Sequence, residues 1–140
     1  YLMKGIILTT HGDLASGLYS TIKMIAGSFD NIRIVEFHDG DNIEQLDKNI
    51  ENAYKELNYS DIFVLSDLAG GTPFNRSVMT LADKENVQFV AGVNFAMLYQ
   101  ALSSEIEDNE EFLEDIITTS KQSIVTYKQE IETSSNQDGI

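Results

Sequence analysis

The chain has 140 residues, enough for one domain with a sizeable core, and 42% of them are hydrophobic, which excludes a disordered chain. Its net charge of -14 argues against nucleic acid and anionic membranes as partners, because both bind basic surfaces. The absence of cysteine excludes disulfides, thiolate metal sites and cysteine nucleophiles, and we expect a cytoplasmic protein.

Apolar runs and amphipathic segments alternate along the chain. Runs of apolar and β-branched residues predict strands over residues 4–10, 31–37, 61–67 and 87–93. Apolar residues at helical spacing predict helices over residues 13–27, 42–57, 73–83 and 95–102. Short connections favour right-handed crossovers. We therefore predict an α/β fold, an open, doubly wound and mostly parallel sheet of four strands with helices on both faces.

The end of the chain departs from this alternation. Residues 109–122 predict one more helix. Residues 123–128 are β-branched and aromatic and leave no room for a crossover, so we predict a C-terminal antiparallel edge strand. A helix continuing to about residue 131 is the alternative. We expect a single domain over residues 1–132, then a disordered tail or the start of a linker over residues 133–140.

Two strand ends carry the residues with distinctive chemistry. His11, one of only two histidines, follows the first strand, and Asp67 stands at the end of the third. If these strands are neighbours, both side chains face one crevice at the carboxyl edge of the sheet. A carboxylate that accepts Nδ1–H fixes the tautomer and leaves Nε2 free. That nitrogen can then be a base, a metal ligand or a nucleophile.

Glycines and helix starts follow both of these residues. Gly12 opens the helix after the histidine, so we expect the first free N–H groups of that helix to point into the crevice. After the aspartate, Gly70 and Gly71 precede Thr72, expected as the N-cap, and Pro73, expected at the first helical position. Two converging helix N-termini form a phosphate cradle. The sequence therefore predicts a nucleophilic histidine that carries a phosphoryl group.

Metal and nucleotide motifs are absent from the sequence. No HExxH, GxGxxG or Walker sequence occurs, and two histidines without cysteine supply few ligands. The loop over residues 38–42 lacks the terminal glutamate of an EF-hand. We predict a turn there, in which His38 lines the site and Asp41 or Asn42 caps the next helix. We expect no metal and no cofactor.

Three segments resemble the enzyme IIA domain of the mannose/fructose/sorbose family of the phosphoenolpyruvate-dependent sugar phosphotransferase system. They are TTHGDLASGL, SDLAGGTPFN and AGVNFAML, and the likeness extends from about residue 4 to residue 128. The second is the most specific, because an aspartate, two glycines, a small hydroxyl residue, proline, phenylalanine and asparagine coincide. Ala96 stands where the family usually has proline. Arg76 lies outside the family pattern, and we expect it at a solvated helix position.

The resemblance implies a phosphotransferase. His11 would accept a phosphoryl group on Nε2 from the phosphohistidine of the carrier protein HPr and pass it to an enzyme IIB component for sugar uptake and phosphorylation. Asp67 would orient the imidazole and stabilise its charge. The loop from Gly70 to Phe74, with Thr72, would bind the phosphoryl oxygens. No sugar would touch this domain, and the membrane would be reached only through the IIC/IID complex.

The resemblance also implies a homodimer in which the last strand crosses to the partner's sheet. Three alternatives remain open. The first is a donor subunit for dihydroxyacetone kinase, whose subfamily departs from the GGTPFN pattern. The second is a regulatory phosphohistidine domain of a transcription activator. The third is a non-catalytic module that binds a small molecule, in which His11→Ala would still bind the ligand.

Overall fold

The computed structural model describes residues 3–128, and the tail expected over residues 133–140 lies outside them. Within the described residues, four parallel strands form one sheet: β1 (Gly5–His11), β2 (Ile32–Phe37), β3 (Ile62–Ser66) and β4 (Val87–Ala91). Their order is β2-β1-β3-β4, so the winding reverses between β1 and β3. This confirms the predicted strands and meets the condition for a shared crevice, that the first and third strands are neighbours.

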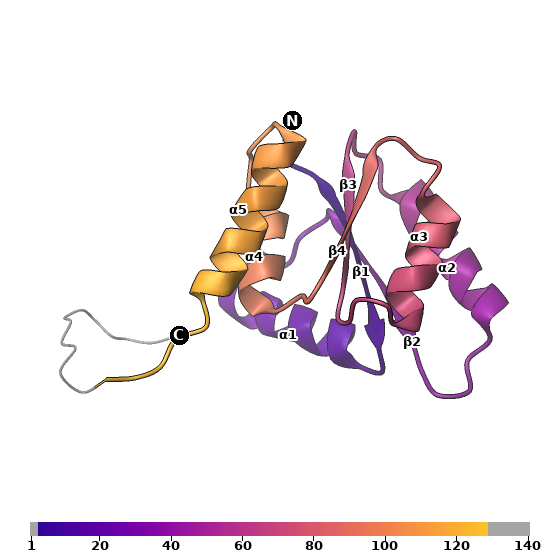
Figure 1. Cartoon of the computed structure of the whole chain (residues 1–140), viewed down its shortest axis with the longest axis horizontal. Helices are drawn as coiled ribbons and strands as arrows, with labels where there is room; N and C mark the ends of the chain where they lie inside the picture. The colour runs from indigo at the N-terminus through magenta and orange to yellow at the C-terminus, as the bar shows by residue number, and fades with distance from the viewer. Residues whose placement is uncertain (1–2, 129–140) are drawn as a thin grey trace.

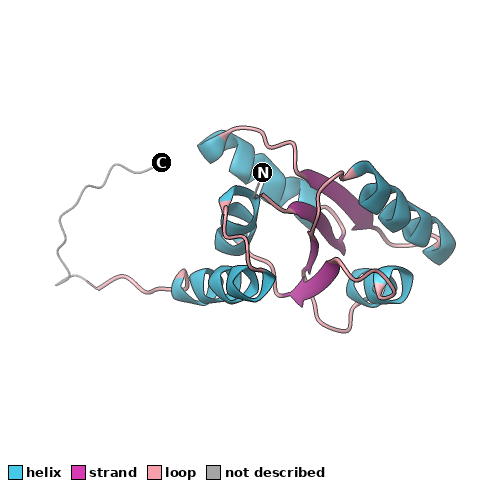
Figure 2. Cartoon of the chain, turned by 90° about the horizontal axis from the view of Figure 1, so that it is seen from above, coloured by secondary structure: helices cyan, strands magenta, loops and turns pink. Residues whose placement is uncertain are grey.

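Helices cover both faces of the sheet, as predicted. The described chain has α1 (Leu14–Ala26), α2 (Ile43–Glu56), α3 (Thr72–Leu81), α4 (Phe95–Ser103) and α5 (Asn109–Gln122). Helices α1, α4 and α5 pack on one face, and α2 and α3 pack on the other (Figure 1). Seen from above, the strands lie between the two groups of helices (Figure 2). None of these helices is long and apolar enough to cross a bilayer.

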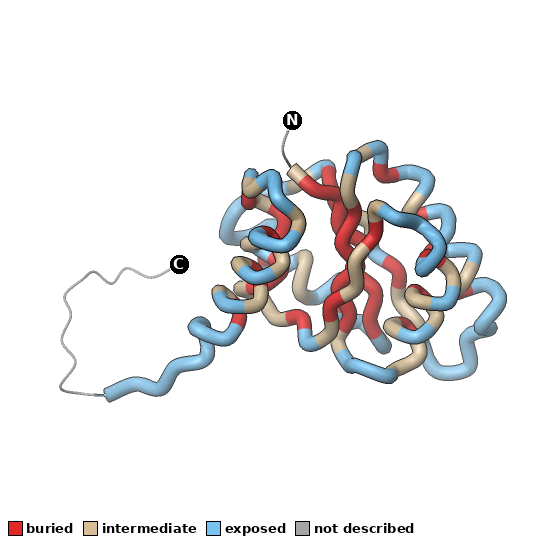
Figure 3. Tube along the Cα trace, turned by 45° about the horizontal axis from the view of Figure 1, so that its top comes forward, coloured by how far each residue is buried: buried red, intermediate tan, exposed pale blue. Residues whose placement is uncertain are grey.

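The strands are apolar throughout because both faces of the sheet are covered. In β1, Ile6 and Leu8 pack into the core on the side of α1, whereas Ile7 packs into the core on the side of α2. The buried residues run through the centre of the molecule along the strands (Figure 3). Each fully buried isoleucine or leucine stabilises the fold by about 2 kcal/mol. The carboxyl ends of β1 and β3 are therefore held from both sides.

Side chains cap several helices of the described chain. Asn42, Asn94 and Asp108 each accept a hydrogen bond from the backbone N–H three residues later, at 3.0, 2.9 and 2.9 Å. Of the two candidate caps for α2, Asn42 is the one used. Asp41 instead accepts the backbone N–H of His38 at 2.7 Å, which closes the turn before the helix.

The segment after α5 forms no strand within the described chain. Ser123 is the C-cap of α5, so the alternative of a longer helix is wrong. Residues 124–128 run away from the sheet (Figure 1). Ile124, Val125 and Tyr127 are 77%, 82% and 85% exposed. The expected antiparallel edge strand is not part of this chain's own sheet, because the segment leaves the domain before it can reach an edge.

Candidate functional site

His11 and Asp67 meet at the carboxyl edge of the sheet. His11 is the last residue of β1, and Asp67 directly follows β3. The Oδ2 atom of Asp67 accepts the backbone N–H of His11 at 3.1 Å and lies 3.0 Å from its ring Nδ1. An ionised carboxylate only accepts hydrogen bonds, so Nδ1 carries the proton and Nε2 keeps its lone pair.

The two side chains of this pair differ in exposure. The His11 side chain is 43% exposed, whereas that of Asp67 is 17% exposed. Burial would raise the pKa of Asp67, but the hydrogen bonds from the ring and the backbone of His11 outweigh it and hold the pKa below its usual value. The Oδ1 atom of Asp67 is buried without a hydrogen-bond partner in the described chain. The carboxylate is therefore ionised at neutral pH and directs its hydrogen bonds at His11.

Gly71 lies against the imidazole of His11. A Cβ atom at this position would lie 2.7 Å from Cε1 of His11 and 3.4 Å from Nε2. Gly71 is also the N-cap of α3. The close approach allows no side chain here, and it places the free ring nitrogen next to the N-terminus of a helix.

The start of α3 leaves donors free. Thr72 is the first helical residue and Pro73 lies in the first turn, so the prediction of Thr72 as the N-cap is wrong. The backbone N–H of Gly71 donates to the carbonyl of Leu68 at 3.0 Å. Those of Thr72 and Phe74 have no acceptor in the described chain. Unpaired N–H groups at a helix N-terminus are suited to an anion.

The start of α1 is different from the expectation. The backbone N–H of Ala15 donates to Oγ1 of Thr10 at 2.9 Å. That of Ser16 donates to Oε2 of Glu36 at 2.8 Å, and the Ser16 hydroxyl donates to the same oxygen. Gly12 donates its N–H to the carbonyl at the end of β2 at 2.8 Å. Gly12, predicted to bind phosphate, thus has its amide already paired, and its φ of 59° instead makes the turn between strand and helix.

His38, expected to line the site, lies among carboxylates. Its Nε2 is 2.8 Å from Oδ1 of Asp13 and 3.6 Å from Oε1 of Glu36, and its Nδ1 is 3.7 Å from Oδ2 of Asp41. The hydrogen bond with Asp13, together with the negative charges of the cluster, raises the pKa of His38 despite a smaller opposing effect of burial. Sequence reasoning missed Glu36. Its place near the end of β2, two residues before His38, was the available signal.

Arg76 does not reach the site. Its Nε and Nη2 donate to the two carboxylate oxygens of Asp47 at 3.0 and 2.7 Å, which ties α3 to α2. The guanidinium lowers the pKa of Asp47. The side chain is 28% exposed, so it is partly solvated and paired with Asp47 rather than fully solvated.

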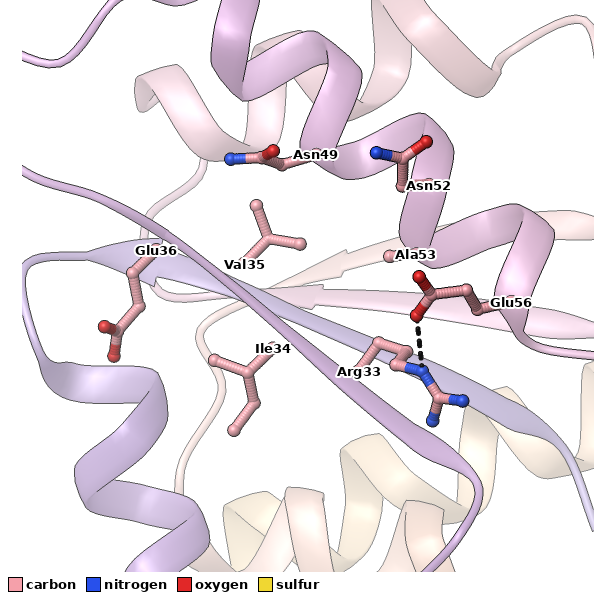
Figure 4. Close-up of a pocket in the computed structure, with 8 residues that line it drawn as sticks. All are labelled: Arg33, Ile34, Val35, Glu36, Asn49, Asn52, Ala53 and Glu56. Atoms are coloured by element: carbon pink, nitrogen blue, oxygen red, sulfur yellow. Dashed lines mark hydrogen bonds and ion pairs between the residues drawn. The ribbon is translucent and has the colours of Figure 1, made fainter.

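An open pocket lies apart from His11. A cavity of about 290 Å³ lies between β2 and α2 (Figure 4), lined by Arg33, Ile34, Val35, Glu36, Asn49, Asn52, Ala53 and Glu56. The ion pair between Arg33 and Glu56, 2.9 Å long, spans the cavity's edge. Glu36 turns away from the two asparagines (Figure 4). His11 is not among the lining residues, and its side chain is 43% exposed.

Comparisons with known proteins found relatives with a similar sequence. A mannose-specific EIIAB component from Escherichia coli (strain K12) is 33% identical over 104 residues, which are 74% of this chain and 32% of that protein. This chain therefore spans about a third of the length of that relative. A fructose-specific EIIA component from Bacillus subtilis (strain 168) is 31% identical over 102 residues, 72% of this chain and 70% of that protein.

A solved structure has the same fold. The mannose/sorbose-specific IIA subunit of the phosphotransferase system from Enterococcus faecalis superposes with a TM-score of 0.82 at 27% identity, covering 94% of this chain and 99% of that one. The family described as PTS system fructose IIA component matches residues 5–119, which include both strand ends of the site. The chain belongs to this family of sugar phosphotransferase IIA components.

Proposed function

We propose that this protein is a cytoplasmic phosphoryl carrier in sugar uptake. In this role His11 accepts a phosphoryl group from phospho-HPr and passes it to an enzyme IIB component. The observation that carries the proposal is the pairing of Nδ1 of His11 with Asp67 at 3.0 Å, which leaves Nε2 unprotonated on a ring that is 43% exposed. Membership of the IIA family supports the same role.

The proposed phosphoryl transfer needs no cofactor. The Nε2 lone pair of His11 attacks the phosphorus of the donor's phosphoimidazole. The new N–P bond forms as the donor's N–P bond breaks, and the donor ring leaves with that electron pair. The proton on Nδ1 stays on His11, so the phosphorylated ring is positively charged and Asp67 stabilises it. Such an in-line transfer depends on positioning and electrostatic stabilisation. Transfer to the IIB histidine follows the same steps with His11 as the leaving ring.

We propose that the start of α3 binds the phosphoryl oxygens. The backbone N–H groups of Thr72 and Phe74 have no acceptor in the described chain, and the neighbouring Gly71 lies against the imidazole. The partial positive charge of the helix N-terminus favours the same anion. The Thr72 hydroxyl adds one further donor within this first turn.

The partners dock directly over the imidazole in this proposal. His11 lies outside the cavity between β2 and α2, and its exposed ring is accessible to another protein. Leu14, three residues after His11, and Leu68, next to Asp67, are 43% and 58% exposed and offer apolar contact area. The net charge of -14 favours partners whose docking faces are basic.

Intact-mass measurement tests the carrier role. The protein is mixed with phosphoenolpyruvate, enzyme I and HPr. We expect a gain of one phosphoryl group that is labile in acid and stable in base. His11→Ala should gain nothing, whereas His38→Ala, which removes the other of the two histidines, should still gain the group. No gain by the wild-type protein, with active control components, would contradict the proposal.

We also propose that residues 123–128 pair with the sheet of a second chain to form a homodimer. The exposed Ile124, Val125 and Tyr127 support this, because the described chain leaves their apolar surface uncovered. Light scattering after size-exclusion chromatography should give a dimer for the full chain. Val125→Lys combined with Tyr127→Lys should shift it toward monomer. Met24→Lys, at an 88% exposed position on α1, should not. A wild-type monomer at micromolar concentration would contradict the proposal.

A further inference from the structure

Side chains from two parts of the chain bring three potential metal-ligand atoms together beside the proposed phosphoryl site. Asp13 precedes α1, Glu36 lies in β2, and His38 follows β2. One ligand atom from each lies within 4.8 Å of the other two. The sequence predicted no metal site, because these residues form no metal-binding motif along the chain. The parallel pairing of β1 with β2 brings them together in space.

The spacing of these atoms fits a small divalent cation. Nε2 of His38 lies 2.8 Å from Asp13 Oδ1 and 3.6 Å from Glu36 Oε1. With bonds of about 2.1 Å, two ligand atoms of a tetrahedral zinc site lie about 3.4 Å apart. The Glu36–His38 distance already matches this value. The Asp13 side chain, 90% exposed, is free to open the shorter distance by the small amount needed.

Neighbouring groups contact Glu36 and His38 through atoms other than the proposed ligand atoms. Oε2 of Glu36 accepts the backbone N–H of Ser16 at 2.8 Å and also its hydroxyl, which leaves Oε1 toward His38. A carboxylate oxygen of Asp41 lies 3.7 Å from Nδ1 of His38 and is itself fixed by the backbone N–H of that residue at 2.7 Å. At 3.7 Å this contact is an ion pair rather than a hydrogen bond, and a negative charge behind the non-ligating nitrogen makes a metal-bound histidine more basic.

We propose that Asp13, Glu36 and His38 bind one divalent transition-metal ion, with Zn²⁺ as the best match. One imidazole and two carboxylates suit Zn²⁺, Co²⁺ and Ni²⁺, whereas Mg²⁺ and Ca²⁺ prefer oxygen ligands. Three protein ligands leave the fourth position of a tetrahedral ion to water. The ion also offsets the negative charge that Asp13, Glu36 and Asp41 concentrate around one ring. The site is independent of the proposed carrier role of His11.

Titration of the unphosphorylated full chain with ZnSO₄ tests the proposal. Isothermal titration calorimetry near pH 7.5, where protons compete less for the ligands, should show one Zn²⁺ per chain. His38→Gln and Asp13→Asn should each weaken the affinity by about tenfold or more. Asp39→Asn removes an exposed charge from the same loop but no proposed ligand, and it should change the affinity by less than about threefold.

NMR of the imidazole nitrogens identifies the ligand directly, because the chain has only two histidines. Zn²⁺ should shift Nε2 of His38 and leave the ring of His11 unchanged, and His11→Gln should retain the binding. Lack of binding by the wild-type protein would overturn the proposal. Binding that survives His38→Gln, or that disappears with His11→Gln, would overturn it as well. Neither result bears on the phosphorylation test, which uses no zinc.

Discussion

The two strand–helix junctions at the carboxyl edge have the same outline and different chemistry. The first junction, residues 11–17, leads from β1 into α1, and the second, residues 67–75, leads from β3 into α3. At the first, the amides of Ala15 and Ser16 are occupied by acceptors of the protein itself. At the second, the amides of Thr72 and Phe74 have no acceptor in the described chain.

Because of this difference, the two junctions supply different groups to the proposed site. In the proposed role the first junction supplies the nucleophile His11, and the helix start of this junction is already neutralised by the Glu36 carboxylate. The second junction supplies the orienting carboxylate, the glycine that contacts the ring and the free donors. An anion next to His11 therefore finds favourable electrostatics on the side of α3 and a carboxylate on the side of α1. Substitutions at one junction at a time test this difference.

Asp67→Asn at the second junction should have the largest effect. The amide oxygen of asparagine keeps an acceptor for His11 but removes the negative charge that stabilises the phosphorylated ring. We expect the rate of phosphoryl transfer from phospho-HPr to fall by about 10²- to 10³-fold. Rapid-quench kinetics measure it. The exposed Asp83→Asn is the matched control and should keep the wild-type rate. An Asp67→Asn rate within threefold of wild type would show that the charge is not needed.

Gly71→Ala should have the next largest effect. Its Cβ would lie 2.7 Å from Cε1 of His11, so the ring must shift from its pairing with Asp67. A displacement of about 1 Å at a reacting group costs about 10²-fold in rate. Gly17→Ala is the control, since nothing lies within 4 Å of its Cβ. In the interior of α1 it should stabilise the fold by about 0.5 to 1 kcal/mol and leave the rate unchanged. Equal rates for the two variants would contradict the proposed contact.

The sequence predicted the scaffold of the site better than its hydrogen bonding. Periodicity located the strands and helices, and the strand-end rule paired His11 with Asp67, because both depend on local pattern and topology. The pairing of the α1 amides was not predictable, because the Glu36 carboxylate comes from β2 and no local pattern reports a contact 20 residues apart. Thr72 has a side chain typical of an N-cap, but the N-cap of α3 is Gly71. The ring of His11 lies too close to Gly71 for a side chain at that position, a contact that the local sequence does not reveal.

The C-terminal segment shows a second limit of sequence patterns. Residues 123–128 have the composition of a strand, yet composition does not say which sheet the strand joins. In the described chain they lie apart from the sheet. The composition therefore predicts a type of element, and the strand on a partner's sheet stays a prediction.

Thr10→Val tests the first junction through stability. Valine keeps the shape of the buried threonine but removes the Oγ1 that accepts the Ala15 amide at 2.9 Å. An unpaired amide at a helix start should lower the free energy of unfolding by about 1 to 2 kcal/mol. Urea denaturation measures it. Thr21→Val, at an exposed position of α1, should change the free energy of unfolding by less than about 0.5 kcal/mol. A similar change in both variants would mean that Thr10 does not cap α1.

The smallest expected effect is a shift in acid titration at the second junction. The hydrogen bonds from His11 lower the pKa of Asp67 against the opposing effect of burial. A lowered pKa in the folded state means that this carboxylate stabilises the fold above the ordinary aspartate pKa of about 3.9. The stabilisation is lost as the pH falls through the lowered value. His11→Gln removes the hydrogen bond from the imidazole ring, so the Asp67 pKa should rise and the loss of stability should begin at higher pH.

Carboxyl ¹³C NMR measures the Asp67 pKa in the wild-type protein and in His11→Gln. Asp47, whose pKa is lowered by Arg76 and which makes no contact with His11, should titrate identically in the two proteins. A wild-type Asp67 that titrates above its ordinary value would show that burial prevails over the bonds from His11.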